Sequence, residues 1–72
     1  MKLTMPQSRP MPEIGSGCHE LRIRTQQIEW RVIYRVDGFA ILVVDIFEKK
    51  TRSTPKRVID ACRRRLNAYD TR

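Results

Sequence analysis

The sequence predicts an α+β fold in which a three-stranded antiparallel sheet, connected as a meander, is followed by a C-terminal helix. Three observations predict it. Apolar residues alternate with polar ones over residues 19–36, an Asp37-Gly38 turn precedes an apolar run, and apolar residues recur at helical spacing near the C-terminus. A chain of 72 residues buries only about 60% of its unfolded surface. We therefore expect one small domain with a thin core and no enclosed cofactor cavity, and we predict no cofactor.

The first strand is predicted over residues 19–24, where Leu21 and Ile23 alternate with charged residues. The second strand is predicted over residues 28–36. Its two expected faces are Trp30, Val32, Tyr34 and Val36 on one side, and Arg31, Ile33 and Arg35 on the other.

The third predicted strand, residues 39–47, is apolar on both faces. It follows Asp37-Gly38, which is a strong hairpin signal because glycine readily adopts a positive φ. A strand of this kind is expected in the middle of a sheet with cover on both sides. One helix covers only one face, so we expect apolar surface on the other face to bind a second protein or a second copy of the chain.

Residues 1–17 contain Pro6, Pro10 and Pro12 together with two glycines, so we expect an extended or turning segment that leads into a domain at residues 18–70. The first residues lack the apolar core of a signal peptide. The longest apolar run, residues 39–44, is far shorter than the roughly 20 residues that span a bilayer. We expect a soluble, cytoplasmic protein.

The C-terminal helix is predicted to begin with Thr54 as the N-cap and Pro55 at the first helical position. Its apolar stripe consists of Val58, Ile59, Cys62, Leu66 and Tyr69.

The two cysteines, Cys18 and Cys62, have no CxxC spacing, and only one histidine accompanies them. A zinc site is therefore not expected, and we predict no metal. Reduced, partly buried thiols are expected instead.

The charge is concentrated in residues 49–65, which hold eight basic residues and only one acid, Asp60. Their excess of +7 equals the net charge of the whole chain. A neutral body with one basic segment is typical of a polyanion-binding protein. The alternative is a solvated helix face without a ligand, and an anionic membrane surface is a weaker alternative.

Basic side chains are also expected to gather on the outward face of the sheet. Arginines 22, 24, 31 and 35 lie on neighbouring strands, and Lys49, Lys50 and Arg52 follow the last strand. Such a cluster can hold phosphates. If the 2′-OH of RNA is the nucleophile, the protein needs only to orient the attack, neutralise the developing charge and supply a proton donor and acceptor. Lysine serves as acid or base where other cations lower its pKa.

Basic residues on a sheet more often bind RNA without catalysis, or lie on a solvated surface, than act as catalysts. His19, the only histidine, is expected at the surface or as a capping residue rather than as a catalyst. Trp30 is expected in the core or at an interface. For Tyr69 two alternatives stay open: a core position, or a hydroxyl that reaches the basic cluster.

The segments MPEIGSGCHELRIR, WRVIYRVD and FEKKTRSTPKRVIDACRRRL resemble the phage-derived, HigB-like branch of the RelE/HigB toxin superfamily. The resemblance covers residues 11–70. It implies a RelE-like fold, with a twisted antiparallel sheet and helices on one side. It also implies the toxin of a type II toxin–antitoxin system, a metal-independent endoribonuclease (an mRNA interferase) that cleaves mRNA in the ribosomal A site and is inhibited by a cognate helix-turn-helix antitoxin.

By this resemblance Arg22, Arg24 and Arg31 match the basic strands of the family's active site, and Lys49 and Lys50 match its basic pair; the alignment of Tyr69 is less certain. We predict two groups of site residues. The catalytic residues are Arg31, Lys49 and Lys50, and the RNA-binding residues are Arg22, Arg24, Arg35, Arg52 and Lys56.

Relatives usually carry two helices before the first strand, and residues 1–9 resemble only the end of that connection. We therefore expect a shortened or attenuated toxin, or a chain that completes its core as a homodimer through the uncovered sheet face. The alternative is a non-catalytic RNA- or protein-binding remnant of the same fold.

Overall fold

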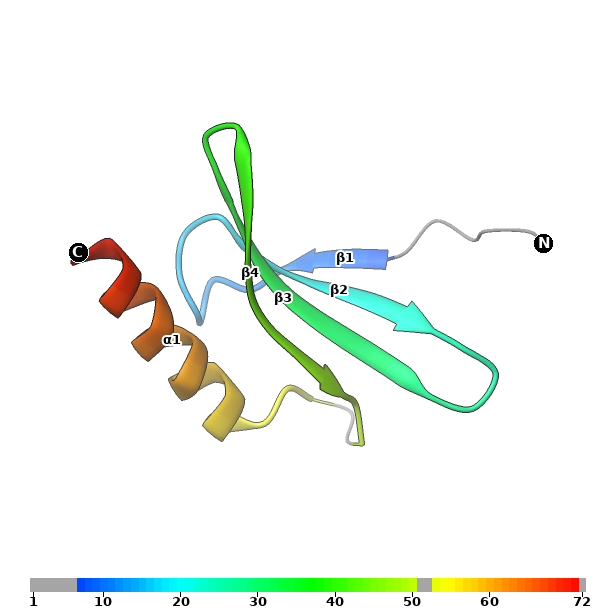
Figure 1. The fold of residues 1–72 in the computed structure, drawn as a ribbon. Coiled ribbons are helices and arrows are strands. Elements are labelled where there is room, and N and C mark those ends of the chain that lie inside the picture. Colours follow the sequence, from blue (N-terminus) through cyan, green and yellow to red (C-terminus); the bar gives the residue numbers. More distant parts are fainter. Residues whose placement is uncertain (1–6, 51–52, 72) are drawn as a thin grey trace.

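A computed structural model of the protein describes residues 7–50 and 53–71. They form a four-stranded antiparallel sheet followed by one helix, α1 (Lys56–Asp70), as Figure 1 shows. The strands are β1 (Gln7–Pro10), β2 (Cys18–Arg24), β3 (Glu29–Asp37) and β4 (Ala40–Glu48). Their spatial order is their chain order, so the sheet is a simple meander.

The α+β class and the meander are confirmed, but the predicted number of three strands is wrong. The additional strand is β1, which pairs antiparallel with β2 from Gln7 opposite Arg22 to Pro10 opposite His19. Proline in this segment favoured an irregular connection. A strand at the sheet edge accepts proline because one side of its backbone needs no partner.

The core lies between the sheet and α1. Its buried residues are Met11, Ile14, Cys18, Ile33, Cys62 and Leu66. Cys62 therefore occupies the predicted apolar stripe, and both cysteines are free thiols. Burial raises the pKa of the Cys62 thiol to about 11, so this thiol is protonated and inert at neutral pH.

Strand β4 is not the central strand that its apolar sequence predicted. It lies at the edge of the sheet, bonded only to β3. A β-bulge shifts the register, so that Ile33 faces Asp45 and Tyr34 faces Val43. The irregular pairing lets Leu42, Val44 and Phe47 pack towards the core. The residues between them, Val43 and Ile46, are left exposed.

The two ends of the helical segment differ from their predictions. Helix α1 begins at Lys56, with Pro55 at the N-cap position and no side-chain cap. Thr54 is therefore not the N-cap, because its hydroxyl donates a hydrogen bond to the Glu20 carboxylate instead. Tyr69 does not belong to the core: its ring lies half exposed beneath the Arg35 guanidinium, 5.7 Å from it, so the ring rather than the hydroxyl contacts one arginine of the predicted cluster.

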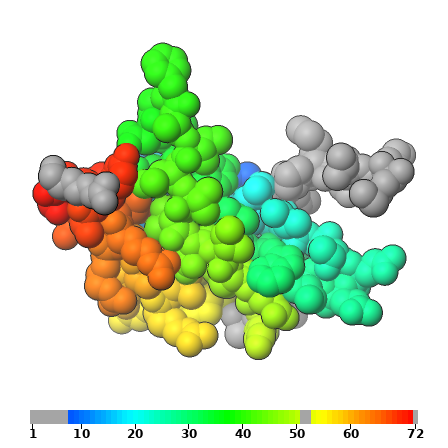
Figure 2. Space-filling view, viewed as in Figure 1, coloured from blue at the N-terminus to red at the C-terminus, as the bar shows by residue number. Residues whose placement is uncertain are grey.

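The hairpin between β3 and β4 is confirmed, and its tip extends beyond the rest of the molecule (Figure 2). Gly38 has φ +62°, and no residue other than glycine has a positive φ in the described part of the chain. A positive φ at the first turn residue alone is the pattern of a type II′ turn. Phe39, the second turn residue, is fully exposed.

Candidate nucleic-acid-binding site

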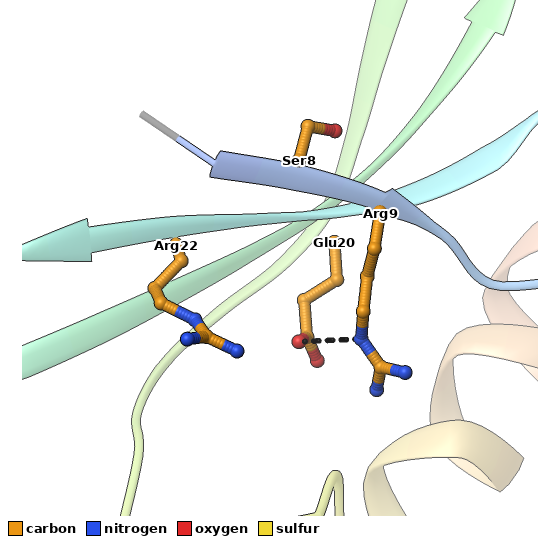
Figure 3. Close-up of a pocket in the computed structure, with 4 residues that line it drawn as sticks. All are labelled: Ser8, Arg9, Glu20 and Arg22. Carbon is orange, nitrogen blue, oxygen red and sulfur yellow. Dashed lines mark hydrogen bonds and ion pairs between the residues drawn. The ribbon is translucent and has the colours of Figure 1, made fainter. Parts of the chain in front are cut away.

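A pocket of about 340 Å³ lies beside β1 and β2 and is lined by Ser8, Arg9, Glu20 and Arg22. Figure 3 shows Arg9, Glu20 and Arg22 projecting from the same side of the two strands, with the carboxylate between the two arginines. Ser8 points to the opposite side, where its Oγ lies 2.7 Å from the hydroxyl of Tyr34. The pocket therefore presents two guanidinium groups around one carboxylate.

Glu20 is only 1% exposed and joins three elements. It accepts hydrogen bonds from Arg31 of β3 and from Thr54, which precedes α1. The Nε of Arg9 donates to the same carboxylate over 3.4 Å. Burial alone would raise the pKa of Glu20, but the Thr54 hydrogen bond and the charges of Arg31 and Arg9 outweigh it and lower the pKa. Glu20 is thus a buried carboxylate at neutral pH.

Glu29 forms a second acidic centre next to the first. Its carboxylate lies 2.9 Å from Nη2 of Arg24, 2.9 Å from Nη2 of Arg31 and 3.5 Å from Nζ of Lys49. The hydrogen bonds from Arg24 and Arg31 lower the pKa of Glu29 to about 2. Arg31 consequently bridges both carboxylates and is 2% exposed.

The predicted outward position is therefore wrong for Arg31 and Arg35, whereas Arg24 is exposed. The side of β3 that carries Arg31, Ile33 and Arg35 is the side that α1 covers, because Ile33 belongs to the core. Arg35 forms a forked ion pair with Asp70 of α1, with both N–O distances between 2.9 and 3.0 Å. The carboxylates that accompany these two arginines offset the cost of burying their charges.

Arg22 differs from the other three strand arginines. It lies half-buried in the pocket wall, directly across from Arg31 in the strand register. No side chain that the structure describes gives it a hydrogen bond or an ion pair, whereas Arg24, Arg31 and Arg35 each have a carboxylate partner. Its five donors are thus available to an external anion.

The cluster around the pocket keeps an excess of positive charge. Five cations face two carboxylates, which leaves three positive charges uncompensated by described side chains. The cations are Arg9, Arg22, Arg24, Arg31 and Lys49, and the acids are Glu20 and Glu29. Arginine forks and an excess of positive charge favour phosphate groups.

The remaining predicted site residues lie near the end of β4 and the start of α1. Lys50 is exposed and lines a hollow of about 190 Å³ together with Lys49 and Arg57. Lys56 is exposed at the start of α1. Arg52 lies outside the described residues. The structure thus connects Lys49 to the pocket through Glu29 and Arg31, but gives no such connection for Lys56 or Arg35.

A family model described as phage-derived protein Gp49-like matches residues 2–67. The chain belongs to this family. Gp49-like proteins are RelE/HigB-like toxins and are associated with toxin–antitoxin systems. An antitoxin is therefore the partner that the family indicates. No curated protein and no solved structure matches the chain.

Within residues 7–50 and 53–71, no three His, Cys, Asp or Glu side chains are grouped closely enough to hold a metal ion. No helix in the same residues is long and apolar enough to cross a membrane.

The pattern of basic residues did not indicate Arg9, Glu20 or Thr54 as parts of the Gp49-like site. The signal for Glu20 is its place on the same strand face as Arg22. Arg9 and Thr54 have no comparable signal, because β1 was not predicted and Thr54 was assigned to the helix cap.

His19 lies away from the pocket: its Nδ1 is 3.1 Å from the carbonyl oxygen of Gly17, and its ring stacks on Tyr34. It therefore caps a turn, as expected.

Proposed function

We propose that this Gp49-like chain is a HigB-like toxin of a type II toxin–antitoxin system that cleaves mRNA on the ribosome in the cytoplasm. The observation that carries the proposal is the Arg22 guanidinium, which has no partner among the side chains that the structure describes and lies in a pocket surrounded by an excess of positive charge. A site of this kind fits the phosphate of an RNA backbone. The partners are mRNA in the ribosomal A site and an antitoxin with a helix-turn-helix domain.

The reaction we propose needs no metal, because the nucleophile comes from the RNA. The ribose 2′-oxygen attacks the adjacent phosphorus, the bond from phosphorus to the 5′-oxygen breaks, and a 2′,3′-cyclic phosphate forms. One proton leaves the 2′-hydroxyl and one is delivered to the 5′-oxygen. Arg22 and Arg9 would bind the phosphate oxygens and neutralise the charge that develops on them.

The three predicted catalytic residues differ in their freedom to reach RNA. Lys50 is exposed at the end of β4, and we assign it the proton transfer. Arg31 is held between Glu20 and Glu29, so we assign it a positioning role that keeps the pocket charged and ordered. Lys49 has the Glu29 carboxylate as partner and would take part after that contact opens.

The experiment is mRNA cleavage on programmed ribosomes, mapped by primer extension. Wild type is expected to give discrete cuts in the A site, and Lys50→Ala and Arg22→Ala are expected to lower cleavage at least 100-fold. Arg64→Ala, which removes an exposed charge from α1, is the matched control and should cleave nearly as wild type does. Circular dichroism checks that each variant is folded.

A second candidate function is RNA or protein binding without catalysis. The observation that favours it is the engagement of Arg31 and Lys49, two of the three predicted catalytic residues, with carboxylates of the chain itself. In that case the message stays intact on ribosomes. Arg22→Ala then only weakens RNA binding and lowers its salt dependence by about one unit, as expected for one lost phosphate contact.

A further inference from the structure

The face of the sheet opposite α1 carries a largely apolar surface, which we call the open face. Cross-strand pairs connect it: Ile23 lies opposite Trp30, Val32 opposite Ile46 and Val36 opposite Ile41. The apolar residues of the open face are Leu21, Ile23, Trp30, Val32, Val36, Ile41, Val43 and Ile46. Two polar aromatic residues lie on the same face: Tyr34 is opposite Val43, and His19 is opposite Tyr34.

These side chains are exposed to a degree that is unusual for residues of their kind. Trp30 is 37% exposed, Val43 54%, Ile46 58% and Ile41 68%. From such fractions the open face amounts to roughly 600 Å² of side-chain surface, at the upper end of what monomers expose in one patch. Two copies in contact would bury about 1,200 Å² in total, which is where specific protein interfaces begin.

The charge of the molecule indicates which occupant fits. The chain carries +7, so two copies repel each other wherever their cations meet. The open face contains no lysine or arginine among the described residues, and Glu48, across from Trp30, is the acid at its border. The pocket arginines project from the other side of the sheet. A second copy can therefore contact this face without bringing cations together.

The shape of the surface also suits a second copy. Two sheets of the same twist pack face to face at about 10 Å with a small angle between their strands. A two-fold axis then places the same residues on both sides of the contact.

Association through the strand edge is hindered instead. The Ile46 amide of β4 donates to Oδ1 of Asp45, and the Val44 carbonyl accepts a hydrogen bond from Arg65. Two of the backbone groups that an added strand would need are thus already bonded.

We propose that the open face is the interface of a homodimer in which two sheets pack face to face and bury Trp30, with the two Arg22 pockets pointing outward in opposite directions. This dimer would give β4 the cover on its second face that its apolar sequence requires. The proposal does not depend on catalytic activity.

The test combines sedimentation with the fluorescence of Trp30, the only tryptophan in the chain. As concentration rises, the mass should increase from 8.5 kDa to twice that value. Over the same concentration range the Trp30 emission should shift to shorter wavelengths and become protected from acrylamide. Moderate salt should strengthen the dimer because it screens the repulsion between two positive copies.

Two single variants, Val43→Lys and Ile46→Lys, place charges on the open face at exposed positions. Each should weaken association at least 100-fold while circular dichroism remains unchanged. Ala68→Lys adds the same charge on the exposed side of α1 and should associate as wild type does.

Three results would overturn the proposal. The first is a monomer at all concentrations up to the millimolar range. The second is a dimer whose Trp30 stays accessible or that Val43→Lys leaves intact, which would mean a different interface. The third is a Trp30 that is shielded equally at every concentration, which would mean that another segment of the same chain covers the open face.

Discussion

Glu20 illustrates how one buried carboxylate can determine the arrangement of a basic site. It bonds to β1 through Arg9, to β3 through Arg31 and to the segment before α1 through Thr54. A carboxylate with three donors is retained as an anion even where burial opposes the charge. Its role is therefore to keep several cations close together in a small protein.

We expect Glu20→Gln to destabilise the protein by roughly 3 kcal/mol, because it leaves the buried Arg31 guanidinium undercompensated. Urea unfolding followed by circular dichroism measures this. Glu13→Gln changes an exposed carboxylate and should have little effect. Equal stability of the two variants would show that the Glu29 carboxylate alone is enough to balance the buried charge of Arg31.

Glu29 makes the stability of the folded protein depend on pH in the acid range. Its pKa is about 2 in the folded chain and 4.5 in the unfolded chain. The folded state therefore binds fewer protons, and the stabilisation is complete above pH 4.5 and is lost as pH falls towards 2. We expect the thermal midpoint to fall over this window, and to fall less steeply in Glu29→Gln. A variant with the wild-type slope would contradict this origin of the acid sensitivity.

At the scale of elements, β4 combines two roles that usually belong to different strands. It is an edge strand, and it is as apolar as a central one. An apolar edge is a site for uncontrolled strand addition. The side chains of Asp45 and Arg65 bond to backbone groups of β4 and to each other at 3.3 Å. They protect the middle of the edge.

We expect Asp45→Ala to increase aggregation, because it frees the Ile46 amide and releases Arg65 from its ion pair. Light scattering and thioflavin binding during incubation at 37 °C measure the effect. Asp60→Ala removes an acid from α1 and raises the net charge equally, so it controls for charge. Similar aggregation of both variants would show that the edge is protected in another way.

Three strands and the helix could be predicted because their signals are local. Alternation indicated β2 and β3, Asp37-Gly38 indicated the hairpin, and the spacing from Val58 to Leu66 indicated α1. Strand β1 was missed because four residues ending in proline give no such signal. The prediction that β4 lies in the middle of the sheet was wrong. An apolar sequence shows that a face of the strand needs cover, but it does not show which part of the protein provides that cover.

The site was predicted less completely, because it depends on which residues face each other across strands. The basic character was visible in the sequence, but the pairing of Arg24 with Glu29 follows from strand register. The contact between Arg35 and Asp70 spans 35 positions and requires the helix to dock. Strand register and helix docking thus distinguish Arg22, which has no partner among the described side chains, from the arginines that are already bonded to carboxylates.

At the scale of the whole molecule, the two faces of the sheet respond to salt in opposite directions. Binding of RNA phosphates at the arginine pocket should weaken as salt rises. Contact between two copies at the open face should strengthen as repulsion is screened. A salt titration in which RNA binding and sedimentation are both measured is expected to show RNA affinity falling while the affinity of the dimer rises. Parallel trends would mean that both events use the same face.

The simple order of the strands also affects how the chain folds. Each strand pairs with the one before it in the chain, so every pairing closes only a short loop. Such a topology of local contacts favours fast folding, with hairpins forming early. The helix contributes Cys62 and Leu66 to the core, and it follows the four strands in the chain. During translation the sheet can therefore assemble first, and the core is completed only after α1 has left the ribosome.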